Sequence, residues 1–206
     1  MTRVKICGLS RPEDIDAVNE VKPDYIGFVF YPKSKRYIPP SKAVELRKRL
    51  LPDIKIIGVF VNEEINVVKD LLIEGTIDIA QLHGQEDENY IRKLKKLTGV
   101  KPVMKAISVK TAADIEEWEG SAADYLLLDH GAGGTGQQFD WGMIPTITKP
   151  WFLAGGLCEE NIDAALDKGA YALDISSGVE TNGVKDRDKI KKLVTHIQGT
   201  KKEEIV

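Results

Sequence analysis

Short apolar runs and longer amphipathic runs alternate along the whole chain. The first apolar run is VKICGL at residues 4–9, and the amphipathic run RPEDIDAVNEV follows it. The same alternation recurs in KIIGVFV before NEEINVVKDLLIEG and in ALDISSG before DRDKIKKLVTHI. Eight such units divide the 206 residues into segments of about 26. The pattern predicts eight β-strands, each followed by a helix, with a sixth helix that is short and irregular.

The apolar runs are nearly continuous, which is typical of parallel strands covered on both faces. Strict alternation of strands and helices predicts a parallel sheet with right-handed crossovers. Eight units of this length favour an α/β fold that closes into a (β/α)₈ TIM barrel over an open sheet. A chain of 206 residues is long for one small domain and short for two, so we expect one barrel domain over residues 1–206.

Helix start and stop signals support these units. Polar residues that can cap a helix precede three amphipathic runs, namely Ser41, Asn62 and Thr111. Glycines that favour helix ends follow others, namely Gly75, Gly99 and Gly169.

Composition and charge exclude several classes of function. Hydrophobic residues make up 42% and charged residues 30%, an ordinary balance for a soluble protein. The net charge of −3 gives no basic surplus for nucleic acid, and no apolar run approaches the ~20 residues of a membrane helix. Two distant cysteines and an N-terminus that turns charged early indicate a cytoplasmic protein. Three histidines without zinc spacing predict no metal site.

In a (β/α)₈ barrel the active site lies on the loops that follow the strands. The residues at these predicted strand ends are Cys7 with Gly8, Phe30, Val61 with Asn62, His83 with Gly84, Ala106, Asp129 with His130, Gly155 with Gly156, and Asp174 with residues 176–178. Several are reactive or permit unusual backbone conformations. The helix ends carry no comparable set, so we expect the site at this end of the barrel.

Two glycine-containing loops predict a phosphate site. LAGGL at residues 153–157 follows the seventh strand, and SSGVE at residues 176–180 follows the eighth. These two loops of a barrel frequently bind phosphate through backbone N–H groups and a short helix N-terminus. The alternative is a pair of tight turns.

Two further loops are candidates for substrate contact. DHGAGGTGQQFDW at residues 129–141 is long and glycine-rich, and we expect Gly133, Gly134, Thr135 and Gly136 to form a lid, the alternative being an incidental insertion. YPKSKRYIPP at residues 31–40 carries three cations, of which Arg36 can grip a carboxylate with two N–H groups. A solvated basic loop is the alternative there.

Taken in order, VKICGL, GFVFYPKSKRYI, QLHG, LLDHGAGGTGQQFDW, LAGGL and DISSGVE resemble phosphoribosylanthranilate isomerase, a family of tryptophan biosynthesis. The resemblance covers essentially the whole chain, and the combination of KICG, GGTG-x-x-FDW and SSGVE is highly specific. It implies a cytoplasmic barrel without a cofactor, present as a monomer or homodimer, that acts on a small phosphorylated molecule. The implied reaction is an aldose–ketose isomerisation of the intramolecular oxidoreductase type. In this Amadori rearrangement, N-(5-phosphoribosyl)anthranilate becomes 1-(2-carboxyphenylamino)-1-deoxyribulose 5-phosphate.

The resemblance also assigns roles to residues. It makes Cys7 the general base, Asp129 the general acid and Arg36 the ligand of the anthranilate carboxylate. It places phosphate on Gly155, Gly156, Ser177 and Gly178. His83 and Asp174 are expected to contact the substrate or to support residues that do.

These roles place demands on the surroundings. A free thiol has a pKa near ~8.5 and only the thiolate is a useful base, so a positive charge should lower the pKa of Cys7. Lys5 lies two residues away on the same face of the strand and is the candidate for that charge. Asp129 can act as an acid only where its protonated form is favoured, and Asp174 is the carboxylate expected to favour it.

Other functions remain open at this point. A related barrel acting on phosphoribosyl compounds would use carboxylates for both acid and base, which Cys7 argues against. A sugar-phosphate epimerase would more often show metal ligands at the strand ends. A phosphate-binding protein without catalysis would not need Cys7 and Asp129 together. A thiol redox sensor would need a second cysteine in reach, and Cys158 fits better as a packed thiol.

Overall fold

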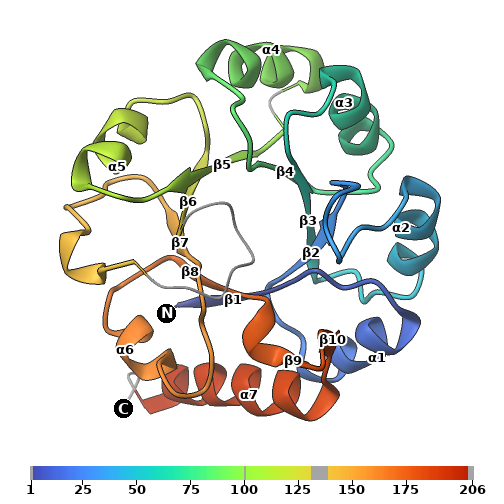
Figure 1. Ribbon diagram of the computed structural model, residues 1–206. Coiled ribbons are helices and arrows are strands. Elements are labelled where there is room, and N and C mark those ends of the chain that lie inside the picture. The colour runs from blue at the N-terminus through green and yellow to red at the C-terminus, as the bar shows by residue number, and fades with distance from the viewer. Residues whose placement is uncertain (1, 100, 131–138, 204–206) are drawn as a thin grey trace.

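The structure is a computed structural model that describes residues 2–99, 101–130 and 139–203, with side chains described as far as residue 200. Eight parallel strands form a closed barrel in sequence order, and the last strand pairs with the first (Figure 1). They are β1 (Arg3–Cys7), β2 (Tyr25–Val29), β3 (Lys55–Phe60), β4 (Ile79–Leu82), β5 (Val103–Ser108), β6 (Tyr125–Asp129), β7 (Trp151–Leu153) and β8 (Ala172–Ile175). The predicted (β/α)₈ barrel is confirmed.

Helices surround the barrel in an outer ring (Figure 1). They are α1 (Pro12–Val21), α2 (Pro40–Arg47), α3 (Ile65–Ile73), α4 (Glu88–Thr98), α5 (Ala112–Glu119), α6 (Ile162–Leu166) and α7 (Arg187–Glu203). Between β6 and β7 the described residues hold only the 3₁₀ turn η1 (Trp141–Met143), which confirms the short sixth helix. The chain after β8 adds three elements that the sequence did not predict, η2 (Ser177–Val179) and the paired β9 (Glu180–Thr181) and β10 (Val184–Lys185).

The helix ends follow the sequence better than the helix starts. Thr111 precedes α5 as predicted, and Asp114 accepts its backbone N–H at 2.7 Å. Ser41 and Asn62 are not caps. α2 already begins at Pro40, whose fixed φ suits the first helical position, and Asn62 has a φ of 53° and accepts a hydrogen bond from the next loop. The predicted glycines all have positive φ, at Gly75, Gly99 and Gly169.

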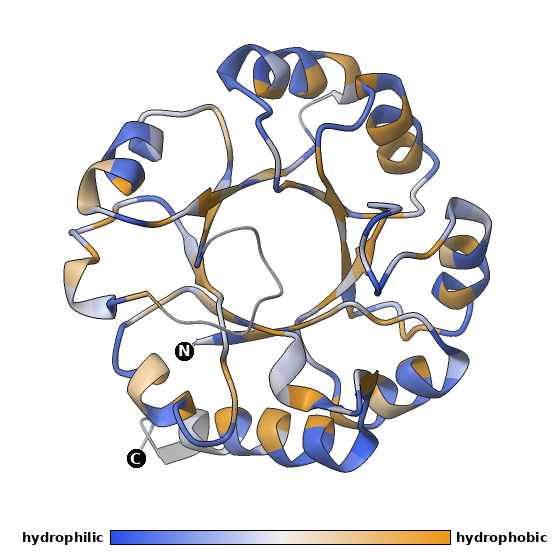
Figure 2. Cartoon of the chain, viewed as in Figure 1, coloured by the Kyte–Doolittle hydropathy of each residue, from blue (hydrophilic) through white to orange (hydrophobic). Residues whose placement is uncertain are grey.

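Alternation along the strands sorts side chains between two cores. The strands of the barrel are coloured mostly as hydrophobic in Figure 2. On β1, Val4 and Ile6 point outward and join the large apolar cluster that the helices cover. The inward positions of the other strands supply a smaller cluster inside the barrel, made of Tyr25, Ile57, Ile79, Met104, Ala106, Leu127, Phe152, Ala154 and Ala172. Lys5 and Cys7 share the inward face of β1, so polar groups occupy the interior toward the carboxyl ends of the strands.

Candidate active site

Cys7 ends β1 with its side chain buried against Val29 and Val59. Gly27 lies directly beside it in the β1–β2 ladder. A Cβ at Gly27 would fall 2.6 Å from the Cys7 sulfur, so the glycine leaves the space that the thiol occupies. The thiol is therefore tightly packed between neighbouring strands at the mouth of the barrel rather than exposed on a loop.

Lys5 lies fully buried inside the barrel, on the same face of β1 as Cys7. Its ammonium donates to Asp174 Oδ2 at 2.7 Å and to Gln81 Oε1 at 2.8 Å. Burial alone lowers the pKa of Lys5, but the negative charge of Asp174 and its hydrogen bond to Lys5 outweigh that effect and raise the pKa above its ordinary value. Two acceptors within hydrogen-bond distance hold Lys5 as an ammonium ion.

The expectation that the pKa of Cys7 is lowered is wrong for the structure as it stands. Burial raises the pKa of the thiol, and Asp174 adds to the rise. Lys5 and Lys185 act in the predicted direction but do not overcome the loss of solvation. The sequence indicated the cation correctly and could not reveal how completely the barrel removes water from the sulfur.

Asp129 ends β6 in a buried position beside the backbone N–H of His130 and the imidazole of His83. Its Oδ1 accepts the backbone N–H of His130 at 2.7 Å. Its Oδ2 lies 3.5 Å from His83 Nε2, and His83 Nδ1 lies 3.1 Å from Gln81 Nε2. Asp129 is thus joined to Lys5 through His83 and Gln81, in one chain of polar contacts inside the barrel.

Asp174 forms an ion pair with Lys5 at one end of this chain. Burial raises the pKa of Asp174, and Lys5 offsets only part of that rise. We take the pair as ionised because the Lys5 ammonium sits 2.7 Å from Oδ2. The other carboxylate oxygen, Oδ1, is buried with no hydrogen-bond partner among the described residues.

Arg36 reaches over the barrel mouth from the loop after β2. Gly8 has a φ of 83°, and a Cβ there would lie 2.4 Å from Arg36 Cδ, so the arginine packs directly on this glycine. The guanidinium holds Glu180 through Nε at 2.6 Å and Nη2 at 3.0 Å. Lys185 also donates to Glu180 at 2.6 Å and to the Ser176 carbonyl at 2.8 Å.

The two predicted phosphate loops contact each other. Gly155 and Gly156 after β7 have φ values of 91° and 64°. A Cβ at Gly178 would lie 2.0 Å from the Leu157 carbonyl oxygen, so only glycine allows η2 to pack against this loop. Ser177 opens η2, and the hydroxyl of Ser176 donates to the Cys7 carbonyl at 3.1 Å. The predicted lid residues 133–136 lie outside the described residues.

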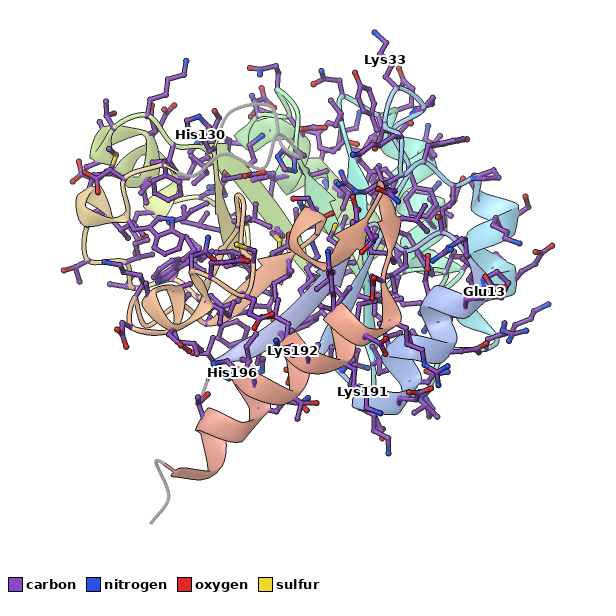
Figure 3. The ribbon with its side chains drawn as sticks, turned by 60° about the horizontal axis from the view of Figure 1, so that its bottom comes forward. Glu13, Lys33, His130, Lys191, Lys192 and His196 are labelled. Atoms are coloured by element: carbon purple, nitrogen blue, oxygen red, sulfur yellow. The ribbon has the colours of Figure 1, made fainter. Side chains whose placement is uncertain are left out.

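The loops after the strands gather at one rim of the barrel. Lys33, in the loop after β2, and His130, just after β6, both lie toward this rim, whereas His196 on α7 lies toward the opposite side (Figure 3). Among the described residues no cluster of three or more His, Cys, Asp or Glu side chains is placed to hold a metal ion. None of the described helices has the length and apolar character needed to cross a membrane.

Comparison with known proteins decides the family. The model of the family described as "N-(5'phosphoribosyl)anthranilate (PRA) isomerase" matches residues 4–196. The chain belongs to the phosphoribosylanthranilate isomerase family. A member of the same name from Endomicrobium trichonymphae is 47% identical over 195 residues, covering 92% of this chain and 95% of that protein.

Solved structures of the phosphoribosylanthranilate isomerase family have the same fold. The enzyme from Thermus thermophilus superposes with a TM-score of 0.86 at 33% identity, covering 97% of this chain and all of that one. Another, in complex with reduced 1-(o-carboxyphenylamino)-1-deoxyribulose 5-phosphate, superposes with a TM-score of 0.81 at 36% identity and the same coverage. The resemblance found in the sequence is confirmed.

Three residues at this isomerase-family site were missed in the sequence. Gln81 shares the inward face of its strand with Ile79 and His83, and a polar residue at such a position was the signal available. Glu180 and Lys185 belong to the β9–β10 pair, which no periodicity in the sequence indicated. The contact between Glu180 and Arg36 spans 144 residues, and only the fold reveals it.

Proposed function

We propose that this chain catalyses the Amadori rearrangement of N-(5-phosphoribosyl)anthranilate to 1-(2-carboxyphenylamino)-1-deoxyribulose 5-phosphate in tryptophan biosynthesis. Family membership supports the reaction. The observation that carries the mechanism is the polar chain that links the surroundings of Cys7 to Asp129 inside one barrel mouth. A thiol and a carboxyl group there provide one base and one acid, as this isomerisation requires.

The substrate is held at both ends. Its phosphate binds the backbone of Gly155, Gly156, Ser177 and Gly178. The positive φ of Gly155 and Gly156 and the close packing at Gly178 support this site. Its carboxylate binds Arg36 on Nη1, to which Glu180 makes no hydrogen bond. Asp174 accepts a sugar hydroxyl on its buried Oδ1, which has no partner among the described residues.

Asp129 starts the reaction by giving its proton to the oxygen of the furanose ring. The carbon–oxygen bond at C1 breaks, and the nitrogen lone pair forms a protonated Schiff base. The Cys7 thiolate then takes the proton from C2, and the electron pair of that bond moves toward the nitrogen to give an enolamine. Tautomerisation to the ketone completes an isomerisation that needs no oxidant or reductant.

The substrate supplies the charge that Cys7 lacks. Burial holds Cys7 as a thiol, since it raises the pKa above the ordinary value. The protonated Schiff base is a cation that forms beside the sulfur, and an adjacent positive charge favours the thiolate. The thiol gives its proton to water before it takes the proton from C2, and Lys5 and Lys185 also favour the thiolate that results.

A direct assay tests this proposal. The labile aminoaldose is generated freshly and the loss of its fluorescence is followed with wild type, Cys7→Ser and Asp129→Asn. We expect wild type to turn over and each variant to lose at least about 100-fold in kcat, the usual contribution of a general acid or base. Cys158→Ser is the matched control, because this second free cysteine lies outside the proposed machinery.

Two outcomes separate the parts of the proposal. Equal turnover by wild type and both variants would exclude the assigned acid and base while leaving the reaction. No turnover by the folded wild-type protein would exclude the reaction itself.

A further inference from the structure

A polar chain inside the barrel contains a residue to which the proposed reaction assigns no task. Gln81 is buried on β4 and accepts a hydrogen bond from the Lys5 ammonium on Oε1 at 2.8 Å. Its Nε2 lies 3.1 Å from His83 Nδ1. The opposite nitrogen of His83, Nε2, lies 3.5 Å from Asp129 Oδ2. The chain therefore runs from β1 through β4 to β6.

The direction of this chain follows from Lys5. An ammonium group has only donors, so the amide of Gln81 must turn its oxygen toward it. Nε2 of Gln81 is then fixed as a donor, and His83 Nδ1 must be the acceptor. A neutral imidazole carries a single proton, which therefore resides on Nε2. An imidazolium ion would place an N–H of His83 against the N–H of Gln81.

We propose that Gln81 is a positioning residue that holds His83 in the neutral Nε2–H tautomer, so that the N–H of His83 faces Asp129 across the 3.5 Å contact. This inference deepens the proposed function and rests on Asp129 being its general acid. His83 is then a support for Asp129 rather than a ligand of the substrate.

The tautomer decides where the acid proton of Asp129 goes. With the proton of His83 on Nε2, the ring cannot accept a proton from Asp129, and the substrate is the remaining acceptor. The carboxylate that forms accepts the His130 N–H on Oδ1, and the Nε2 of His83 lies 3.5 Å from Oδ2. In the other tautomer the bare Nε2 of His83 competes with the ring oxygen for that proton.

Gln81→Glu inverts the arrangement with little change of shape. The new carboxylate accepts from Lys5 on one oxygen and requires a donor at His83 Nδ1 on the other. We expect the ring to change to the Nδ1–H tautomer or to an imidazolium ion. Gln85→Glu is the matched control, because it makes the same change at an exposed position four residues away.

The tautomer is measured directly by NMR. Long-range proton–nitrogen correlation spectra of isotopically labelled histidine distinguish the two tautomers, and the chain has only three histidines to assign. Spectra are recorded at about pH 8, above the ordinary titration range of imidazole, and His83→Asn identifies the signal. We expect Nε2–H in wild type and Gln85→Glu, a change in Gln81→Glu, and a mixture in Gln81→Leu, where no group holds Nδ1.

Activity supplies the second readout. We expect Gln81→Glu to lower kcat on the order of 10-fold or more, the effect of losing one hydrogen bond to a charged group. KM should stay within about twofold, because Gln81 does not touch the substrate.

An Nδ1–H tautomer in wild type would overturn the inference, and this result needs no variant to fold. A change of tautomer in Gln81→Glu with kcat unchanged would overturn the link to Asp129. If wild type showed no turnover at all, the proposed reaction would fail, while the spectra would still decide the tautomer.

Discussion

Gly27 gives the sharpest test of how the Cys7 thiol is held. A Cβ added there would lie 2.6 Å from the Cys7 sulfur and 3.1 Å from the Cys7 Cα. The sulfur would have to recede by about 0.8 Å to reach an ordinary contact of 3.4 Å, and the Cα, which is backbone, cannot rotate away. Overpacking of this kind costs typically 1–3 kcal/mol, so we expect Gly27→Ala to destabilise the barrel by about 2 kcal/mol.

Thermal unfolding and steady-state kinetics measure the two consequences. A loss of about 2 kcal/mol lowers Tm by roughly 4–8 °C in a chain of this size. A displacement near 1 Å at a reacting group costs on the order of 100-fold in rate, so kcat should fall about that far. Gly120→Ala is the control, because a Cβ there meets nothing within 4 Å, and its stability should stay within about 0.5 kcal/mol of wild type.

A double-mutant cycle shows whether the sulfur is responsible. In a Cys7→Ala background the closest contact is absent, so Gly27→Ala should cost less than in wild type, with a coupling of at least about 0.5 kcal/mol. If Gly27→Ala unfolded at the temperature of wild type and kept its kcat, the thiol would not be wedged against this glycine. If the cost were the same in both backgrounds, the strain would lie in the backbone instead.

Three further outcomes follow from the buried charges and the thiol. Lys5→Met should lower the free energy of unfolding, measured in urea, by about 3–5 kcal/mol, because Asp174 is left buried without its partner. Adding Asp174→Asn should restore part of that free energy. If it restored none, the ion pair would be contradicted. Burial alone would raise the pKa of Glu180, but hydrogen bonds from Arg36 and a lysine lower it. The contribution of Glu180 to the free energy of unfolding is therefore fully present above about pH 4.3 and is lost as the pH falls through its lower folded pKa. Between about pH 5 and 3, Glu180→Gln should therefore lose less stability than wild type. Equal losses in the two proteins would refute this. Because burial raises the pKa of Cys7, iodoacetamide should label it more slowly than free cysteine at pH 7, as mass spectrometry would show. The labelling rate of Cys7 should rise with pH only above the range in which free cysteine, with a pKa near ~8.5, becomes reactive. Labelling as fast as free cysteine would contradict the burial.

The strand positions and their inward faces could be predicted because period and alternation are local properties. Cys7, His83 and Asp129 stand at the ends of apolar runs, and parallel strands in a barrel bring such ends to one rim. Lys5 followed from Cys7 by simple alternation. Predicting these residues did not require knowing which segments, far apart in the sequence, contact each other.

The remaining features depend on contacts between segments that are far apart in the sequence. Arg36 was predicted as a carboxylate ligand, and the fold shows that Glu180 already occupies two of its nitrogens. The sign of the Cys7 pKa shift depends on how much water the assembled barrel excludes, which no local pattern gives. Ser41 failed as a cap because Pro40 begins the helix first, a competition between two adjacent local signals.

The pairing of β1 with β8 determines when during folding the active site is complete. Lys5 and its partner Asp174 are 169 positions apart, so their contact forms only when the final strand reaches the first. During synthesis on the ribosome, Cys7, Gln81 and Asp129 are made before Asp174. Until Asp174 is made, the Lys5 ammonium has no carboxylate partner. The buried ion pair therefore forms only when β8 pairs with β1 and closes the barrel. We expect enzyme activity to appear at this last step of folding rather than earlier.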